Sequence, residues 1–257
     1  METEVKESPI RSVDRALDII EELSKHPKGL GLMELSRAVN LHKTTTFRML
    51  SAIMTHGWIA KDPISGNYRL TLMLFEIGSK VSARMNILNV ARPYLDDLTA
   101  RMGETVHLVI RDGSEVVYLY KEDSLNQAIK MGSSIGSRNP LYCTGVGKAI
   151  LAYLNEDELE EIWKASNIRQ VTRSTITSLD QMKKELELTR QRGWAQDNEE
   201  NEIGVRCVAV PILNRRGFPI ASISISSSVF HITQANIPSI AKAVQNVCKA
   251  IANQLGL

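Results

Sequence analysis

Four side chains near residue 45 have the chemistry that nucleic-acid recognition requires. Lys43, Thr44, Thr45 and Arg48 lie where a short turn leads into a predicted helix. Hydroxyl groups bond to phosphates or bases, and an arginine fork matches O6 and N7 of guanine. Between residues 37 and 69 the chain has five Lys or Arg and one acid. We therefore predict that this helix binds DNA; the alternative is a charged, solvated face of a scaffold helix.

A glycine-containing segment in the second half of the chain is suited to holding an anion. Gly145 and Gly147 stand in Thr-Gly-Val-Gly-Lys, where a loop enters a predicted helix. Glycines let backbone N–H groups come close to a ligand at a helix start, where the helix dipole also favours negative charge. The glycine spacing is not that of a phosphate P-loop. A glycine-assisted tight turn is the alternative interpretation.

Three serines alternate along a predicted strand near the C-terminus. Ser222, Ser224 and Ser226 are separated by apolar residues, so their side chains share one face of a sheet. Hydroxyls on an otherwise apolar, half-buried surface indicate a small polar ligand. The alternative is that the hydroxyls bond to neighbouring backbone.

The segment from residue 197 to 202 contains four acids and precedes a strand with a cysteine. Such acids are suited to a hard cation, although a solvated acidic loop is the commoner outcome. Cys207, His107 and Asp197 together would form a thiol triad or a metal site if the fold joined them. Cys207 lies in an apolar strand, where a buried, inert thiol is usual. We therefore expect no catalytic residue, no metal and no cofactor.

Composition sets the limits for the rest of the interpretation. The chain has 257 residues, a length that suits two domains, with 43% hydrophobic and 23% charged residues and a net charge of +2. Three widely spaced cysteines argue against a disulfide framework. The polar N-terminus does not look like a signal peptide, and no apolar run reaches the roughly 20 residues of a membrane span. We expect a cytoplasmic protein with no membrane contact.

The first 71 residues are predicted to form a winged helix-turn-helix. A helix over Ser12–Lys25 is followed by a short helix over Leu32–Val39 and a third from about Lys43 to His56. The inward face of the first helix is predicted to carry Val13, Ala16, Leu17, Ile20 and Leu23, and that of the third Phe47, Leu50, Ile53 and Met54.

Two short strands follow the third helix and complete the wing. They are predicted at Trp58–Lys61 and Asn67–Leu70, around a turn of hairpin type. Lys61 and Arg69 on this wing are expected to contact the DNA backbone, whereas Tyr68 is expected in the core.

The remaining chain is predicted to be a helical linker and an α+β domain with an antiparallel sheet. Two helices within residues 72–102 are candidates for a linker and dimerisation region, and a change of composition at Gly103 begins the second domain, residues 103–257. Predicted strands are Val106–Ile110, Val116–Tyr120, Ala128–Met131, Val205–Leu213 and Pro219–Ser226, and predicted helices are Val146–Leu154, Glu156–Ala165, Leu179–Arg192 and Ala235–Gln254.

Over nearly its whole length the chain resembles the IclR family of bacterial transcription regulators. The resemblance rests on ordered motifs: Arg11–Leu17, the helix-turn-helix, Tyr68–Gly78, Gly103–Leu108, Thr144–Lys148, Asp197–Glu200 and Gly204–Pro211. It implies a GAF-like effector domain that binds small organic acids. Carried onto this chain, the family's effector-binding positions are Met131, Asn139, Gly145, Val146, Asp197, Val205, Cys207, Ser224 and Ser226; relatives vary at Asn139 and Val146.

Within the family the chain looks most like regulators of pectin and uronate catabolism that respond to 2-keto-3-deoxygluconate. Ile135–Tyr142, Arg173–Ser178 and Asp197–Glu202 carry this closer likeness. The resemblance implies a homodimer, or a tetramer made of two dimers, that binds a near-palindromic double-stranded operator and is released by its effector. Two alternatives stay open: a regulator of aromatic-acid catabolism with the same architecture, and a thiol-dependent enzyme on the GAF-like domain.

Overall fold

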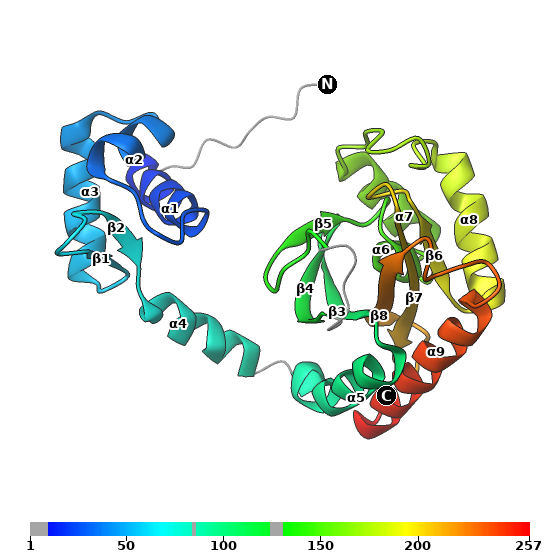
Figure 1. The fold of residues 1–257 in the computed structure, drawn as a ribbon. Helices are drawn as coiled ribbons and strands as arrows, with labels where there is room; N and C mark the ends of the chain where they lie inside the picture. The colour runs from blue at the N-terminus through cyan, green and yellow to red at the C-terminus, as the bar shows by residue number, and fades with distance from the viewer. Residues whose placement is uncertain (1–9, 84–85, 124–130) are drawn as a thin grey trace. The chain divides into compact units, whose positions relative to one another are not determined.

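The chain divides into two compact units in the computed structural model (Figure 1), which describes residues 10–83, 86–123 and 131–257. The first unit is Met1–Arg84 and the second is Met85–Leu257. The division falls inside the range predicted as a linker. Among the described residues, no helix has the length and apolar character needed to cross a membrane.

The first unit is a helix-turn-helix with a two-stranded wing. Its elements are α1 (Arg11–Ser24), α2 (Leu32–Ala38), α3 (Lys43–Thr55), β1 (Ile59–Lys61), β2 (Tyr68–Leu70) and α4 (Leu72–Ala83). The wing strands pair antiparallel, with Lys61 opposite Tyr68 and Ala60 opposite Arg69. The turn between them is closed by the Asp62 carboxylate, which accepts hydrogen bonds from the backbone of Ile64 and Ser65 at 3.0 and 2.8 Å.

The inward face of α1 differs from the prediction. Ile19 and Leu23 are buried, whereas Val13 and Leu17 are about half exposed. The helix starts at Arg11 and has no side-chain cap, so Ser12 lies within its first turn. Ile19 is buried because α1 contacts α3 and β2. The face of α1 that makes these contacts is rotated about the helix axis from the face predicted by hydrophobicity alone.

The inward face of α3 also differs in part. Leu50 and Ile53 are buried as predicted, and Thr46 is buried with them, its hydroxyl bonded to the carbonyl of His42 at 3.2 Å. Phe47 is 52% exposed, because the helical spacing that buries Thr46, Leu50 and Ile53 turns it outward. Tyr68 is 3% exposed and packs in the core of this unit, as expected.

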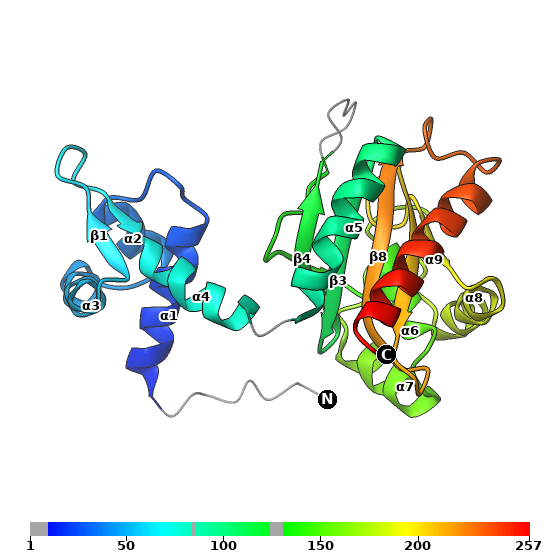
Figure 2. The same cartoon turned by 90° about the horizontal axis from the view of Figure 1, so that it is seen from below.

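The second unit is an antiparallel sheet with helices on both faces (Figure 2). Its elements are α5 (Asn86–Met102), β3 (Thr105–Asp112), β4 (Glu115–Glu122), β5 (Arg138–Pro140), α6 (Gly145–Leu151), α7 (Glu156–Ala165), α8 (Leu179–Arg192), β6 (Ala195–Asn198), β7 (Val205–Leu213), β8 (Pro219–Ser228) and α9 (Ile237–Gln254). The strand order is β5-β4-β3-β8-β7-β6, which confirms the α+β prediction.

Two strands in this sheet were not predicted, and one prediction lies outside the described residues. The short strands β5 and β6 add to the edges of the sheet, β5 beside β4 and β6 beside β7. The strand predicted at Ala128–Met131 falls mostly on residues 124–130, which the structure does not describe. The sequences of β5, Arg-Asn-Pro, and β6, Ala-Gln-Asp-Asn, do not alternate apolar with polar residues, so the pattern did not indicate strands there.

Alternation along the strands gives the sheet two faces, and each face packs against helices through an apolar core. One face of the sheet sends Leu108, Val208, Ile223 and their neighbours into a core shared with α5 and α9. The opposite face carries Ser224 and Ser226 toward α6. Helix α5, predicted as part of a linker, packs into the core through Leu88, Ala91, Leu95 and Leu98.

Candidate functional site

The predicted DNA-binding residues of α3 lie at its exposed beginning. Lys43, Thr44 and Arg48 are exposed and Thr45 is partly exposed. Because these residues lie in the first two turns of α3, the unpaired N–H groups at the start of the helix and its basic side chains lie at the same exposed end. Phe47, which the prediction had placed inward, shares this exposed part of the helix.

The two wing residues are placed on neighbouring strands of the hairpin. Lys61 ends β1 and Arg69 lies in β2, and both are exposed. The Lys61 ammonium group lies 5.5 Å from the centre of the Tyr68 ring, so its stem is held against the buried tyrosine. The wing therefore presents two basic side chains whose backbone is fixed by β pairing.

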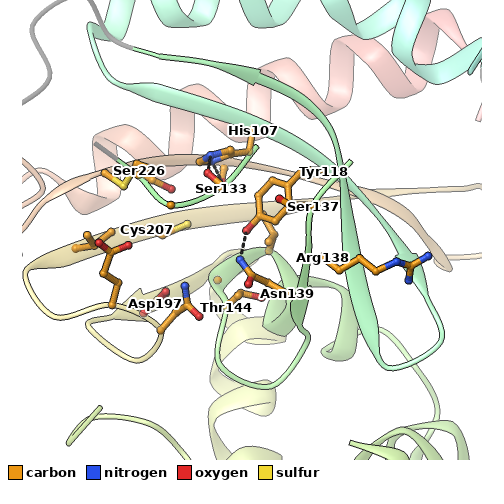
Figure 3. Close-up of a pocket in the computed structure, with 18 residues that line it drawn as sticks. His107, Tyr118, Ser133, Ser137, Arg138, Asn139, Thr144, Asp197, Cys207 and Ser226 are labelled. Atoms are coloured by element: carbon orange, nitrogen blue, oxygen red, sulfur yellow. Dashed lines mark hydrogen bonds between the residues drawn. The ribbon is translucent and has the colours of Figure 1, made fainter. Parts of the chain in front are cut away.

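All nine predicted effector-binding residues line one cavity in the second unit (Figure 3). Its volume is about 240 Å³. The remaining lining residues are His107, Tyr118, Gly132, Ser133, Ser137, Arg138, Thr144, Asn201 and Glu202. The cavity opens on the face of the sheet that α6 covers, so residues from all six strands of this sheet and from the start of α6 meet there.

The floor of the cavity is a row of paired strand residues. Ser226 pairs with Cys207, and Cys207 pairs with Asp197 on the next strand. Ser224 pairs with His107 on β3. These residues share a face because strands alternate with a period of two, which is why serines two residues apart both reach the cavity.

The start of α6 forms another wall through close backbone packing. Thr144 caps the helix, its hydroxyl accepting the N–H of Gly147 at 3.1 Å. A Cβ at Gly147 would lie 2.2 Å from the carbonyl oxygen of Leu141, so only glycine fits. Within the part of the chain that the structure describes, no group accepts a hydrogen bond from the N–H groups of Gly145 and Val146, which line the cavity.

A buried charge cluster stands behind this wall. The Lys148 side chain is 1% exposed, and its ammonium group donates a hydrogen bond to Glu200 Oε1. The Glu200 N–H donates to Asp197 Oδ1 at 2.7 Å. Burial raises the pKa of Asp197 from 3.8 to about 7; the negative charge of Glu200 adds to this effect and Lys148 opposes it. Asp197 and Glu200 of the acidic segment are therefore packed into the fold, whereas Glu199 and Glu202 are partly exposed.

His107 and Tyr118 complete the cavity and were not predicted as binding residues. Their rings meet edge to face, with centres 5.2 Å apart. Asn139 Nδ2 donates to the Tyr118 hydroxyl at 3.2 Å, which leaves the phenolic proton free for another acceptor. Burial, and secondarily the charge of Lys121, lowers the pKa of His107 to about 3. Strand alternation places both residues on the face of the sheet that carries Ser224 and Ser226. Only the order of the strands shows that they reach the same cavity.

Arg138 lines the cavity without sending its charge into it. Its guanidinium group turns away from the other labelled side chains (Figure 3) toward Asp112 and Glu115. Those contacts are exposed ion pairs.

The fold does bring Cys207, His107 and Asp197 around one cavity, but not as a thiol triad. Burial, and secondarily the charge of Asp197, raises the pKa of Cys207 to about 12. Both nitrogens of His107 bond to serine hydroxyls rather than to the thiol. Among the described residues, no group of three or more His, Cys, Asp or Glu has the arrangement of a metal site.

Comparisons with known proteins identify the family. The IclR helix-turn-helix domain matches residues 12–63, and the bacterial transcriptional regulator IclR C-terminal domain matches residues 79–253. The regulator KdgR and the DNA-binding transcriptional repressor YiaJ, both of Escherichia coli, are each 34% identical to the chain. KdgR is matched over 96% of this chain and 93% of its own length, and YiaJ over 98% and 90%.

Solved structures agree with these matches. The crystal structure of the Thermotoga maritima IclR is 35% identical, covers 96% of this chain and 99% of its own, and has a TM-score of 0.83. The equal identity to KdgR and YiaJ means that the likeness is not specific to the 2-keto-3-deoxygluconate regulator. The matched family consists of transcription regulators and not of enzymes. The chain belongs to the IclR family of bacterial transcriptional regulators, and it binds DNA and a small-molecule effector.

Proposed function

We propose that this protein represses genes of sugar-acid catabolism, of the pectin and uronate type, and releases its operator when 2-keto-3-deoxygluconate or a related small organic acid binds. The observation that carries the proposal is that all nine residues expected to bind an effector line one cavity. Of the three segments on which the closer likeness to this type of regulator rests, Ile135–Tyr142 and Asp197–Glu202 contribute to that cavity and Arg173–Ser178 does not.

The size and chemistry of the cavity favour a small, oxygen-rich acid. Its volume of about 240 Å³ lies below the range of about 300–1,000 Å³ usual for drug-sized ligands. The N–H groups of Gly145 and Val146 are suited to a carboxylate, and the hydroxyls of Ser224 and Ser226 to a keto or hydroxyl oxygen. Asp197 is suited to sugar hydroxyls, because an ionised form would repel the ligand's own carboxylate.

On the DNA side, Lys43, Thr44, Thr45 and Arg48 are assigned to the major groove and the wing residues Lys61 and Arg69 to phosphates. A major groove admits one helix, and residues near its beginning reach the base edges. In a dimer two such helices would read half-sites about one helical turn apart. Such a regulator acts on chromosomal DNA, so we infer a cytoplasmic location.

We further propose that the chain acts as a homodimer, with residues 72–102 as linker and dimerisation region between domains at 1–71 and 103–257. Helix α4 supports this assignment, because Leu72 and Phe75 are 81% and 74% exposed. Exposed apolar side chains on a helix are typical of a surface that another chain covers. A tetramer made of two such dimers is the larger assembly we expect.

A thermal-shift screen of the full chain against sugar acids and aromatic acids tests the proposal. A ligand at about 100 times its Kd adds about 2.7 kcal/mol to the folded state, enough for a clear shift. A shift with 2-keto-3-deoxygluconate, together with release of labelled operator in fluorescence anisotropy, is expected. A response to aromatic acids alone would refute the sugar-acid assignment, and operator affinity unchanged by every acid would refute ligand control.

A double substitution separates binding of the effector from binding of DNA. Ser224→Val with Ser226→Val replaces both hydroxyls by apolar methyl groups that also take up space in the cavity, so we expect the ligand response to be lost and the operator affinity to be kept. The matched control is Ser239→Ala on α9, whose hydroxyl bonds to the carbonyl of Asn236 away from the cavity. Induction that survives the double substitution would mean that the serines are structural.

A further inference from the structure

We propose that His107 is a specificity-determining residue of the effector cavity, a hydrogen-bond relay between Ser224 and Ser133 whose two tautomers let Ser224 offer the ligand either a proton or a lone pair. The inference rests on the proposed function of the cavity as the effector site. From the sequence, His107 was a candidate only for a thiol triad or a metal site.

The geometry holds the imidazole between two hydroxyl groups. His107 is 4% exposed and lines the cavity from β3. Its Nδ1 lies 3.3 Å from the Ser224 hydroxyl, and its Nε2 lies 2.9 Å from the Ser133 hydroxyl. The Tyr118 ring packs edge to face against it, so the ring orientation is fixed from a third side (Figure 3).

Burial keeps this imidazole neutral, since the pKa of His107 is lowered to about 3 by desolvation and by the nearby charge of Lys121. A neutral imidazole has one N–H donor and one acceptor nitrogen. One of the two serines therefore donates to the ring while the other accepts from it. The hydrogen-bonding direction at Ser224 is thereby linked to the direction at Ser133, 26 residues along the chain from His107.

Each tautomer suits a different ligand oxygen. When Nδ1 carries the proton, Ser224 accepts from the ring and its own proton is free for a keto or carboxylate oxygen. When Nε2 carries it, Ser224 donates to Nδ1 and its remaining lone pair accepts a ligand hydroxyl. The Cys207 thiol, which also neighbours Ser224, is only a weak alternative acceptor. The cavity is therefore suited to both members of a pair of 2-keto and 2-hydroxy acids.

The segment that carries Ser133 is anchored separately, which provides a control. The Lys121 ammonium group donates to the carbonyl oxygens of Met131 and Ser133 at 3.2 and 2.9 Å. These bonds hold the wall of the cavity in place but do not involve the ring nitrogens of His107. Loss of Lys121 should weaken both classes of ligand, whereas loss of the relay should alter the choice between them.

The test measures the Kd of full-length protein for matched acids by calorimetry. The probes are pyruvate with lactate, glyoxylate with glycolate, and 2-keto-3-deoxygluconate with its 2-hydroxy reduction product. In His107→Phe a bound hydroxy acid leaves the Ser224 proton without a good acceptor, at a cost corresponding to about 5- to 150-fold in affinity. We expect the ratio of the hydroxy-acid Kd to the keto-acid Kd to rise by about ten-fold or more.

Two further variants keep the test decisive. Ser133→Ala removes the acceptor of the Nε2 proton and should move the ratio in the same direction, whereas Lys121→Met should raise both Kd values and leave the ratio within about three-fold. Operator binding without ligand shows that each variant is folded. An unchanged ratio in both His107→Phe and Ser133→Ala overturns the relay alone. Wild-type protein that binds none of the acids overturns the effector assignment and the relay with it.

Discussion

Replacing Asp197 by asparagine should change the way in which stability depends on pH. In the folded protein burial raises the pKa of this carboxyl from 3.8 to about 7. Between these values the folded state holds a proton that the unfolded state has lost, so the contribution of Asp197 to stability falls as pH rises from about 4 to about 7. Asparagine has no such proton, and its contribution is constant over the same range.

The magnitude follows from the two pKa values. At about 1.4 kcal/mol per pH unit, the difference corresponds to about 4 kcal/mol in total, of which roughly 3 kcal/mol fall between pH 5 and pH 8. Relative to wild type, Asp197→Asn should therefore gain stability by this amount as pH rises. The Asp197 Oδ1 contact with the Glu200 N–H is one that an asparagine oxygen can also accept.

Urea denaturation at several pH values measures the effect. A Trp58→Phe background restricts tryptophan fluorescence to Trp163 and Trp194, both in the second unit. Asp180→Asn makes the same chemical change at an exposed position on α8 and should follow wild type at every pH. A constant difference between Asp197→Asn and wild type from pH 5 to pH 8 would refute the reasoning, because Asp197 would then titrate alike in both states.

Arg48→Ala should weaken specific operator binding by about 1–3 kcal/mol and relax one base preference, whereas Lys61→Ala should reduce the slope of log affinity against log salt concentration by about one. Anisotropy titrations at several salt concentrations measure both effects. If both variants match wild type, neither residue contacts DNA. Gly147→Ala forces a Cβ to within 2.2 Å of the Leu141 carbonyl oxygen, so a loss of about 1–3 kcal/mol or more is expected in urea melts; wild-type stability would contradict this packing. Cys207 is 6% exposed with a pKa of about 12, so iodoacetamide at pH 8 should alkylate it far more slowly in folded than in unfolded protein; rapid modification would contradict its burial.

Local patterns in the sequence determined much of this protein. The serine alternation indicated one shared face, and the structure places Ser222, Ser224 and Ser226 on the side of the sheet away from Ile223 and Ile225. The wing, the turn before α3 and the ends of α7 and α8 were also predictable, because caps, turns and periodicity act within a few residues. The motifs that carried the family resemblance are also short, continuous runs of residues.

The tertiary structure decided which of these elements meet. His107 and Ser224 are 117 residues apart in the chain, and only the placement of β3 beside β8 brings them to one cavity. Lys148, in a segment that looked like an anion site, is instead buried against Glu200. The outward turn of Phe47 depends on packing between helices rather than on hydrophobicity. The register between distant strands arises only when the core is assembled, and so does the shift of a pKa by burial. No single stretch of sequence therefore contains either of them.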